Sequence, residues 1–368
     1  MPTLPRPDVL LTRRLAGCAL FAAIASACAG APQQQAMTAS SGTTGVAVSD
    51  IRARLYEAAK REGALTVWGP ATDTVTKYFP EEFQKAFPGV TLTGVSDNQA
   101  PAKLVTEMRA GTFDADALWW PYTGALALDE RGWLTTFTPD ERAAFGIGDD
   151  GADMDGRALK VANFVYGLVY DTRALTSDAV PKTWEGLGDP RWRGRITGST
   201  LLTPFLVAGL GLVNGEAWAL DFARTLRRAE IALVPDSIMA IDMLMRGEKA
   251  LMITTPGVVM ERRARFHETI EWSAVSPTFA TQHVAVVVNR GPHPNAAKLW
   301  ALWAASAEGQ AAMDRGAFEV SARPGAPTAQ ARLVAESGAR VVFETLDMVK
   351  PRMALHNKVR PILFGEAP

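Results

Sequence analysis

Few side chains in this sequence have spacings that could support catalysis. Its four histidines, His267, His283, His293 and His356, do not have the spacing of a metal site or of a Ser-His-Asp triad. We interpret each of them as a surface or strand-end residue. The sequence contains no Gly-x-Ser-x-Gly motif, while a glycosidase-like pair of carboxylates stays open because acidic residues are common. The sequence therefore favours a binding protein over an enzyme, and we expect no cofactor.

Hydrogen-bonding residues gather instead in three loops, 69–73, 96–100 and 120–124, each of which follows an expected strand. None of these loops carries a glycine-rich nucleotide or dinucleotide motif. At the carboxyl ends of strands in an α/β sheet, such loops bind small ligands. The candidate ligand-binding residues here are Thr72, Asp73, Asp97, Asn98, Trp119, Trp120 and Tyr122. The tryptophans could offer a flat surface to an organic group, or could pack in the core, and only one of the two adjacent rings can point toward a ligand.

Composition argues against a nucleic-acid partner. The chain has 368 residues and a formal net charge of −1, so it lacks the basic excess that a phosphate backbone demands, and we expect no nucleic-acid partner. The dense basic run "ERRAR" at 261–265 is typical of a solvated helix face.

The first 28 residues have the pattern of an export signal, with arginines, a short apolar stretch and the small residues "SACAG". Both cysteines, Cys18 and Cys28, lie in this segment. Cys28 follows small residues as a lipidated cysteine would, and simple cleavage of the signal is the alternative. Residues 29–49 are small and polar and predict a flexible tether. We expect an exported protein that contacts the membrane only through the lipid.

Helices and strands alternate from Ser49 or Asp50 onward. A strand at 64–69 is followed by a helix at 74–87 with a break at Pro80, and strands at 89–96 and 115–120 enclose a helix at 101–111. The pattern recurs late in the chain, where the β-branched stretch 283–291 precedes an amphipathic helix that begins near Pro294 with Asn295 as a cap. The alternation predicts parallel sheets covered by helices.

Four segments resemble the substrate-binding proteins of bacterial ABC importers, in the branch of two-lobed periplasmic proteins that includes ferric-iron binders. They are "YGLVYDTRAL" (166–175), "PKTWEGLGDPRWRGRI" (181–196), "LMRGEKALM" (244–252) and "HPNAAKLWALWAASAEGQ" (293–310). The resemblance covers roughly residues 50–330, and the second segment is its most specific part.

The resemblance implies an α/β, two-lobed periplasmic-binding-protein type 2 fold, in which each lobe is a mostly parallel sheet flanked by helices and hinge strands cross between the lobes. Lobe 1 would comprise residues 50–167 plus 285–322, and lobe 2 residues 168–284 plus 323–368. The first crossing is expected near "VYGLVYDT" and the return near "QHVAVVV". A monomer of this kind would capture a small polar solute in an interlobe cleft and deliver it to an ABC permease of the inner membrane.

The same resemblance adds site residues in the second lobe. Thr203 falls in the turn that holds an anion in iron-binding relatives, and Asp236 and Thr255 fall where asparagines assist it. Thr254 adjoins Thr255. The tyrosine pair that binds iron falls at Gly257 and Val258, so an iron site would retain only Glu107 as a candidate acidic ligand. We therefore expect an amine-bearing or zwitterionic solute with Asp236 at its positive end, unless Asp236 only caps a helix. Ferric iron, an anion, or a secreted enzyme on this fold are the alternatives.

Overall fold

The structure is a computed structural model that describes residues 43–70, 74–235, 237–315, 321 and 325–366. The predicted export signal, with Cys28 and most of the predicted tether, lies outside these residues. From residue 42 onward the chain forms one compact unit.

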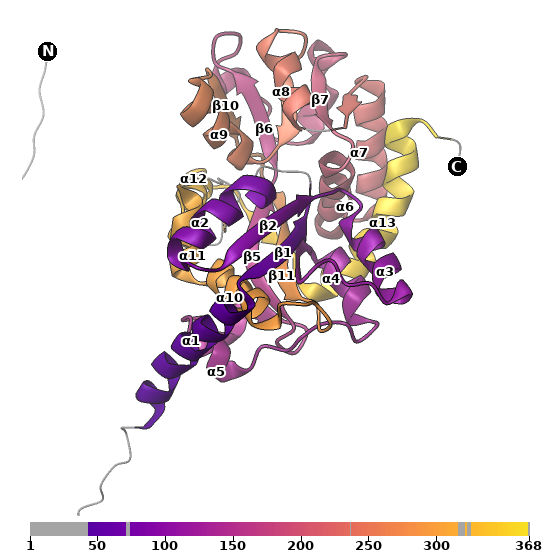
Figure 1. The fold of residues 1–368 in the computed structure, drawn as a ribbon. Coiled ribbons are helices and arrows are strands. Elements are labelled where there is room, and N and C mark those ends of the chain that lie inside the picture. Colours follow the sequence, from indigo (N-terminus) through magenta and orange to yellow (C-terminus); the bar gives the residue numbers. More distant parts are fainter. Residues whose placement is uncertain (1–42, 71–73, 236, 316–320, 322–324, 367–368) are drawn as a thin grey trace, which may run out of the picture. The chain divides into compact units, whose positions relative to one another are not determined.

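Two mixed sheets organise this unit, and each forms the centre of one lobe (Figure 1). The sheet of lobe one has the order β2-β1-β3-β11-β5-β4, with β12 also paired to β11. The sheet of lobe two has the order β10-β6-β9-β7-β8. Strands of lobe one are β1 (Ala64–Gly69), β2 (Thr91–Ser96), β3 (Ala117–Pro121), β4 (Ala152–Asp153), β5 (Ala158–Val165), β11 (Thr278–Val287) and β12 (Val341–Phe343). Strands of lobe two are β6 (Gly167–Asp171), β7 (Ile196–Ser199), β8 (Ala232–Val234), β9 (Leu251–Thr254) and β10 (Ile270–Ser273).

The two-lobed α/β fold that the resemblance implied is confirmed, but the expectation that each sheet is mostly parallel is wrong. The sheets are mixed because strands that leave or re-enter a lobe run against their neighbours. β11 is antiparallel to both β3 and β5, and β6 is antiparallel to β9 and β10. The pairs β1–β2, β1–β3, β7–β8 and β7–β9 are parallel, as the alternation of strands and helices predicted.

The helices cover these sheets. They are α1 (Thr43–Glu62), α2 (Phe79–Ala86), α3 (Ala100–Ala110), α4 (Tyr122–Asp129), α5 (Pro139–Ala143), α6 (Leu202–Asn214), α7 (Glu216–Arg228), α8 (Ser237–Met245), α9 (Pro256–Phe266), α10 (Pro294–Ala305), α11 (Ala307–Asp314), α12 (Ala329–Glu336) and α13 (Leu346–Phe364). A π-helical turn, η1 (Thr74–Tyr78), precedes α2, and Pro80 lies in the first turn of α2. Short 3-10 turns are η2 (Asp149–Gly151), η3 (Ser177–Ala179), η4 (Glu185–Gly188) and η5 (Pro190–Trp192). Helix α1 begins at Thr43, so residues 43–49, expected in the tether, belong to this helix.

The late helix α10 packs on lobe one, as its apolar face predicted. Leu299, Trp300 and Trp303 are buried in the core that also contains Phe79 and Phe83 of α2. The first turn of α10 is hydrogen-bonded to the end of α1, because the Glu62 carboxylate accepts hydrogen bonds from the Asn295 and Ala296 amides at 3.1 and 2.7 Å. The expectation that Asn295 caps α10 is wrong: His293 is the N-cap residue, and the Asn295 side chain donates to Glu62 instead.

The first crossing between the sheets is at Tyr166, between β5 and β6, within the segment expected for it. Gly167 begins β6 where no side chain fits, since a Cβ there would lie 2.4 Å from Trp272 Nε1 and 2.7 Å from the Ser273 carbonyl oxygen. The Tyr166 amide donates to the Phe279 carbonyl at 3.2 Å, and its carbonyl accepts from Thr278 Oγ1 at 2.7 Å. The crossing is therefore fastened to the start of β11.

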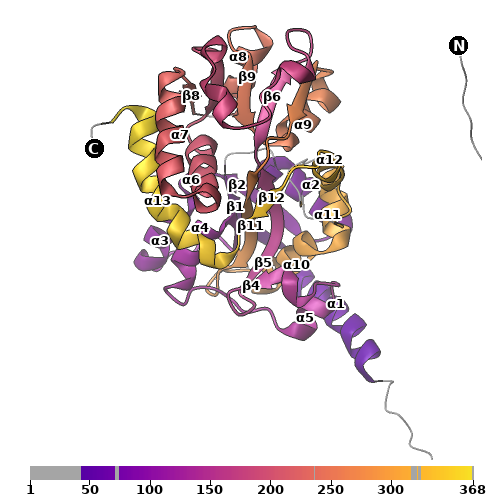
Figure 2. The same ribbon diagram turned by 180° about the vertical axis from the view of Figure 1, so that it is seen from behind.

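The return crossing precedes Thr278, because β11 belongs to the sheet of lobe one along its whole length. The expected boundary at residue 285 is thus too late. A third crossing follows β12, which pairs with β11 in lobe one, whereas α13 packs against α6 and α7 of lobe two (Figure 2). The C-terminal segment therefore joins the two lobes, although we expected residues 323–368 to belong to lobe two alone.

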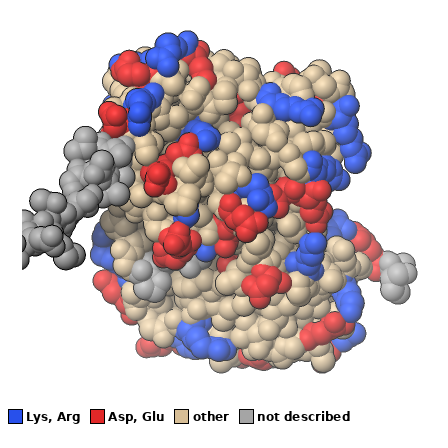
Figure 3. All heavy atoms as spheres, turned by 90° about the horizontal axis from the view of Figure 1, so that it is seen from below, with Lys and Arg blue, Asp and Glu red and all other residues tan. Residues whose placement is uncertain are grey.

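Charged side chains are well mixed on the surface. Figure 3 shows acidic and basic groups interspersed on one face, without a large patch of a single sign. Among the described residues, no helix combines the length and apolar character needed to span a bilayer.

Candidate functional site

Two helix N-termini in lobe two carry the predicted threonines. α6 follows β7, and its first turn holds Thr203, while Thr254 ends β9 and Thr255 is the N-cap residue of α9. The Ser199 hydroxyl accepts hydrogen bonds from the Leu201 and Leu202 amides at 3.1 and 3.0 Å, which fixes the entrance to α6. Helix N-termini of this kind present free backbone N–H groups and a partial positive charge.

The hydroxyls of Thr203 and Thr254 are both buried, and neither has a hydrogen-bond partner among the described residues. Thr203 lies over β7, since a Cβ on Gly198 would be 2.3 Å from its hydroxyl oxygen. Thr254 is the pairing partner of Gly167 at the first crossing. A buried hydroxyl without a partner costs roughly 1–3 kcal/mol, so each of these two groups calls for a partner such as water or a ligand. Thr255 is also buried, and its side chain does not cap α9.

The three aromatic residues predicted from lobe one lie in the core. Trp119 is fully buried, with edge-to-face contacts to Phe79 and His283 at centroid distances of 5.0 and 5.1 Å. Trp120 belongs to the core on the opposite face of the sheet. The Tyr122 ring is buried and its hydroxyl donates to Asp153. This placement matches the core-packing alternative, not an exposed aromatic surface.

In the loop after β2, the predicted site residue Asp97 interacts with residues close to it in the sequence. Asp97 accepts hydrogen bonds from the Gln99 amide at 2.8 Å and from the Lys103 ammonium. The Lys103 hydrogen bond lowers the pKa of Asp97. Asn98 is exposed. Thr72, Asp73 and Asp236 lie outside the described residues, as does Cys28.

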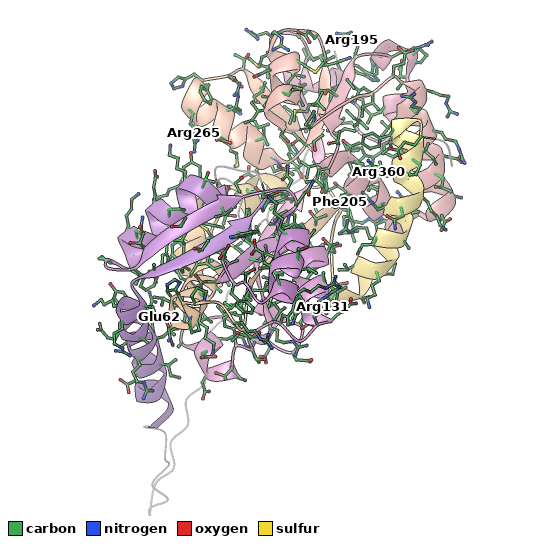
Figure 4. All side chains as sticks on the ribbon, turned by 45° about the vertical axis from the view of Figure 1, so that its right-hand side comes forward. Glu62, Arg131, Arg195, Phe205, Arg265 and Arg360 are labelled. Atoms are coloured by element: carbon green, nitrogen blue, oxygen red, sulfur yellow. The ribbon has the colours of Figure 1, made fainter. Side chains whose placement is uncertain are left out.

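Tyr78 was missing from the predicted site. It ends η1 in lobe one, and its ring lies 4.4 Å from the guanidinium carbon of Arg265 on α9 of lobe two (Figure 4). Its hydroxyl is buried without a partner among the described residues. Arg265 also forms an ion pair with Glu261 at 2.8 Å. The run at 261–265 is thus only partly a solvated face, and its helical spacing alone could not show which arginine turns toward lobe one.

His283 is a second residue that the sequence interpretation misplaced. It lies in the interior of β11, buried, with its ring stacked on Phe164 at a centroid distance of 4.0 Å. Burial, and to a lesser extent the charge of Arg352, lowers the pKa of His283 to about 3, so the ring is neutral. Its Nδ1 has no hydrogen-bond partner among the described residues. The unbroken β-branched sequence around it was the available signal for burial.

The residues of an iron site are not gathered here. Gly257 and Val258 occupy the first turn of α9, where relatives would place the tyrosine pair. Desolvation raises the pKa of Glu107 on α3, and its Oε2 has no hydrogen-bond partner in the described part of the chain. Across the described part of the chain, no group of three or more His, Cys, Asp or Glu side chains could hold a metal ion.

The described residues also line cavities away from these threonines. One of about 600 Å³ lies in lobe one beside Asp129, Arg142 and Arg157. Another, of about 430 Å³, lies beside Lys182, Trp272 and Leu333. Neither is lined by a predicted site residue.

Comparisons with known proteins agree with this architecture. Residues 80–338 match the family described as bacterial extracellular solute-binding protein. No curated protein sequence matches the chain.

Solved structures with the same fold include iron-bound HitA from Pseudomonas aeruginosa, at 17% identity and a TM-score of 0.62, over 80% of this chain and 99% of that one. The substrate-binding protein of an ABC transporter from Agrobacterium tumefaciens has 18% identity and a TM-score of 0.65, over 82% of this chain and 94% of that one. The ferric binding protein from Campylobacter jejuni has 13% identity and a TM-score of 0.65, over 82% of this chain and 99% of that one.

Proposed function

The chain belongs to the family of bacterial extracellular solute-binding proteins, and from this membership we propose that it captures a small polar organic solute between its lobes. Members of this family are substrate-binding proteins of ABC transporters and are not enzymes. The proposed partner is an ABC permease of the inner membrane, to which the monomeric protein delivers its solute. We also propose that the exported chain is held at the membrane by a lipid on Cys28.

One observation carries the proposal: the buried hydroxyls of Thr203 and Thr254 have no hydrogen-bond partner among the described residues, and Thr254 pairs with Gly167 at the first crossing. Both can donate to a polar solute, and the N-termini of α6 and α9 add backbone N–H groups. These side chains are buried, and we propose that a solute reaches them when the lobes separate. Hinge motion at crossing strands is how two-lobed binding proteins open and close.

The solute we propose is amine-bearing or zwitterionic. Asp236, which precedes the α8 segment in the sequence, would face its positive end, and the alternative is that Asp236 caps this helix. Iron fits less well, because Gly257 and Val258 supply no phenolate oxygen for a hard cation.

A thermal-shift screen tests the function. A solute at 100 times its dissociation constant stabilises the protein by about 2.7 kcal/mol. Amino acids, polyamines and betaines are screened beside ferric iron and inorganic phosphate. Stabilisation by ferric iron alone would overturn the organic-solute proposal.

Asp236→Ala then separates the two roles of that carboxylate. A lost cap costs about 1 kcal/mol of unfolding free energy with little change in affinity. A broken charge pair costs about 2–5 kcal/mol in affinity. Loss of stability with unchanged affinity would assign Asp236 to the cap.

A further inference from the structure

Arg352 forms a fully buried ion pair at the third crossing. It comes from the second turn of α13, and its Nε donates to Glu344 Oε1 at 2.6 Å, with neither side chain exposed. The other Glu344 oxygen accepts from the Gln282 amide at 3.1 Å. Glu344 follows β12 of lobe one, whereas α13 packs on α6 and α7 of lobe two, so the pair joins the lobes.

Most of the guanidinium's hydrogen-bonding capacity is unused. Both Nη1 and Nη2 are buried, and neither has an acceptor among the described residues. Together these two nitrogens carry the four outer N–H bonds of the guanidinium fork. Glu344 balances the charge, but it leaves these donors without partners. A buried charged group left in this way is costly and calls for an acceptor.

The unused donors lie on α13, which packs against α6, the helix whose first turn holds Thr203. The Phe205 ring, labelled in Figure 4, lies 4.7 Å from the Arg352 guanidinium carbon, and Phe205 is two residues after Thr203 in the first turn of α6. The guanidinium is close enough to His283 to help lower the pKa of that ring, and it also acts on Tyr166 at the first crossing. Among the described residues, polar atoms without partners thus occur on α6 and on two elements that pack against it: the Arg352 nitrogens on α13, His283 Nδ1 on β11 and the Thr203 hydroxyl on α6.

We propose that Arg352 is the anchor for a carboxylate group of the transported solute. This inference rests on the proposed function and names the anionic part of its ligand. The planar guanidinium fork matches the two oxygens of a carboxylate.

Charge balance favours a carboxylate over a phosphate. The Arg352–Glu344 pair is neutral overall, and burial lowers the pKa values of His283 and His356, which keeps both rings uncharged. A monoanion therefore adds one negative charge to a buried region, and a phosphate dianion would add two. A zwitterion brings its own compensating amine.

Matched solute pairs test the anchor by calorimetry. Each amino acid of a panel, with alanine, proline and 4-aminobutyrate among them, is compared with its amide, which lacks the carboxylate charge. The wild type should bind at least one acid about tenfold or more tightly than its amide. Arg352→Met and Arg352→Lys should each weaken that binding by about thirtyfold or more, since methionine lacks the donors and lysine lacks the fork.

The matched control is Arg142→Met. Arg142 is also buried, pairs with Asp149 at 2.9 Å and has a partnerless Nε, but it lines the cavity in lobe one. Its replacement should leave solute affinity unchanged. If Arg352→Met does not fold, Arg352→Lys, which retains the charge beside Glu344, carries the test.

The outcomes separate the anchor from the function. Equal binding of acid and amide, or unchanged affinity in the Arg352 variants, would overturn the anchor and leave solute binding intact. Stabilisation by an uncharged solute alone would do the same. A wild-type protein that binds no member of the screen would overturn both proposals.

Discussion

The guanidinium carbon of Arg265 lies 4.4 Å from the centre of the Tyr78 ring, so a helix of lobe two touches the turn that follows β1 in lobe one. The contact lies away from the crossing strands, because Tyr78 ends η1 and Arg265 is in the last turn of α9. A cation over an aromatic ring contributes about 0.5–2 kcal/mol, depending on desolvation. This contact would help hold the lobes together.

A double-mutant cycle with Arg265→Ala and Tyr78→Leu should therefore show coupling. We expect about 0.5–2 kcal/mol in the free energy of unfolding measured with urea. Arg263→Ala is the control. Arg263 lies on the same helix as Arg265 but pairs with Glu271 of β10 at 3.3 Å, so the stability effects of Arg263→Ala and Tyr78→Leu should be additive. Equal coupling for both arginines would show that the Tyr78 contact is not specific.

Thr203→Val and Thr254→Val remove the two buried hydroxyls with little change of shape. Because neither hydroxyl has a partner within the residues that the structure describes, the unfolding free energy should stay constant or rise, while affinity for the solute falls about tenfold or more. Thr197→Val is the control: the Thr197 hydroxyl donates to the Ala232 carbonyl at 2.9 Å, so its loss should cost about 1 kcal/mol of stability and no affinity. Calorimetry and urea unfolding measure both quantities, and unchanged affinity in both site variants would remove the threonines from the site.

Closure on a solute should protect segments of both lobes at once. Amide hydrogen exchange at 97–100, 119–123, 202–204 and 254–256 is expected to slow together when the stabilising solute is added. Mass spectrometry of peptides follows each segment, and the solvent-exposed residues 148–150 supply the unaffected reference. Protection in a single lobe would contradict a site shared between them.

His283 should make stability depend on pH. Its pKa is about 3 in the folded protein, below the value of about 6.5 in the unfolded chain, so the unfolded chain binds the extra proton between these values. Stability therefore falls as pH decreases from about 6.5 toward 3, by at most about 1.4 kcal/mol per pH unit for this group. His283→Phe removes the titration and retains a ring for stacking on Phe164. Urea unfolding between pH 7 and 4 should give a shallower slope for the variant, and identical slopes would show that His283 does not contribute.

Cys28 lipidation can be tested directly in cells. Labelling with a radioactive or clickable fatty acid should mark the wild-type protein and not Cys28→Ala. Cys18→Ala is the matched control and should retain the label, because Cys18 lies within the expected signal. A labelled Cys28→Ala protein, or an unlabelled wild type, would contradict the anchor.

Local patterns in the sequence were sufficient for several elements and for the α/β class, whereas the two-lobed fold followed from the resemblance. Strand β1 and the helical segments around η1, α2 and α10 follow from apolar periodicity, and the position of Pro80 in a first turn follows from its missing N–H group. The crossing at Tyr166 lies in the segment that the resemblance indicated. Thr203 was proposed as a site residue from the resemblance, and Thr254 because it adjoins Thr255; in the structure Thr203 lies in the first turn of α6 and Thr254 ends β9.

Only the tertiary structure decided which side chains meet. Burial of His283 requires Trp119 and Phe164 on neighbouring strands, and the Arg265–Tyr78 contact requires two helices from different lobes. The pairing of β12 with β11 likewise places Glu344 within hydrogen-bonding distance of Arg352, and neither residue was predicted from the sequence as a site residue. Periodicity reports which face of an element is apolar, but the partner of that face depends on contacts between distant segments. The same limit explains why the tryptophans that seemed suited to a ligand are packed in the core.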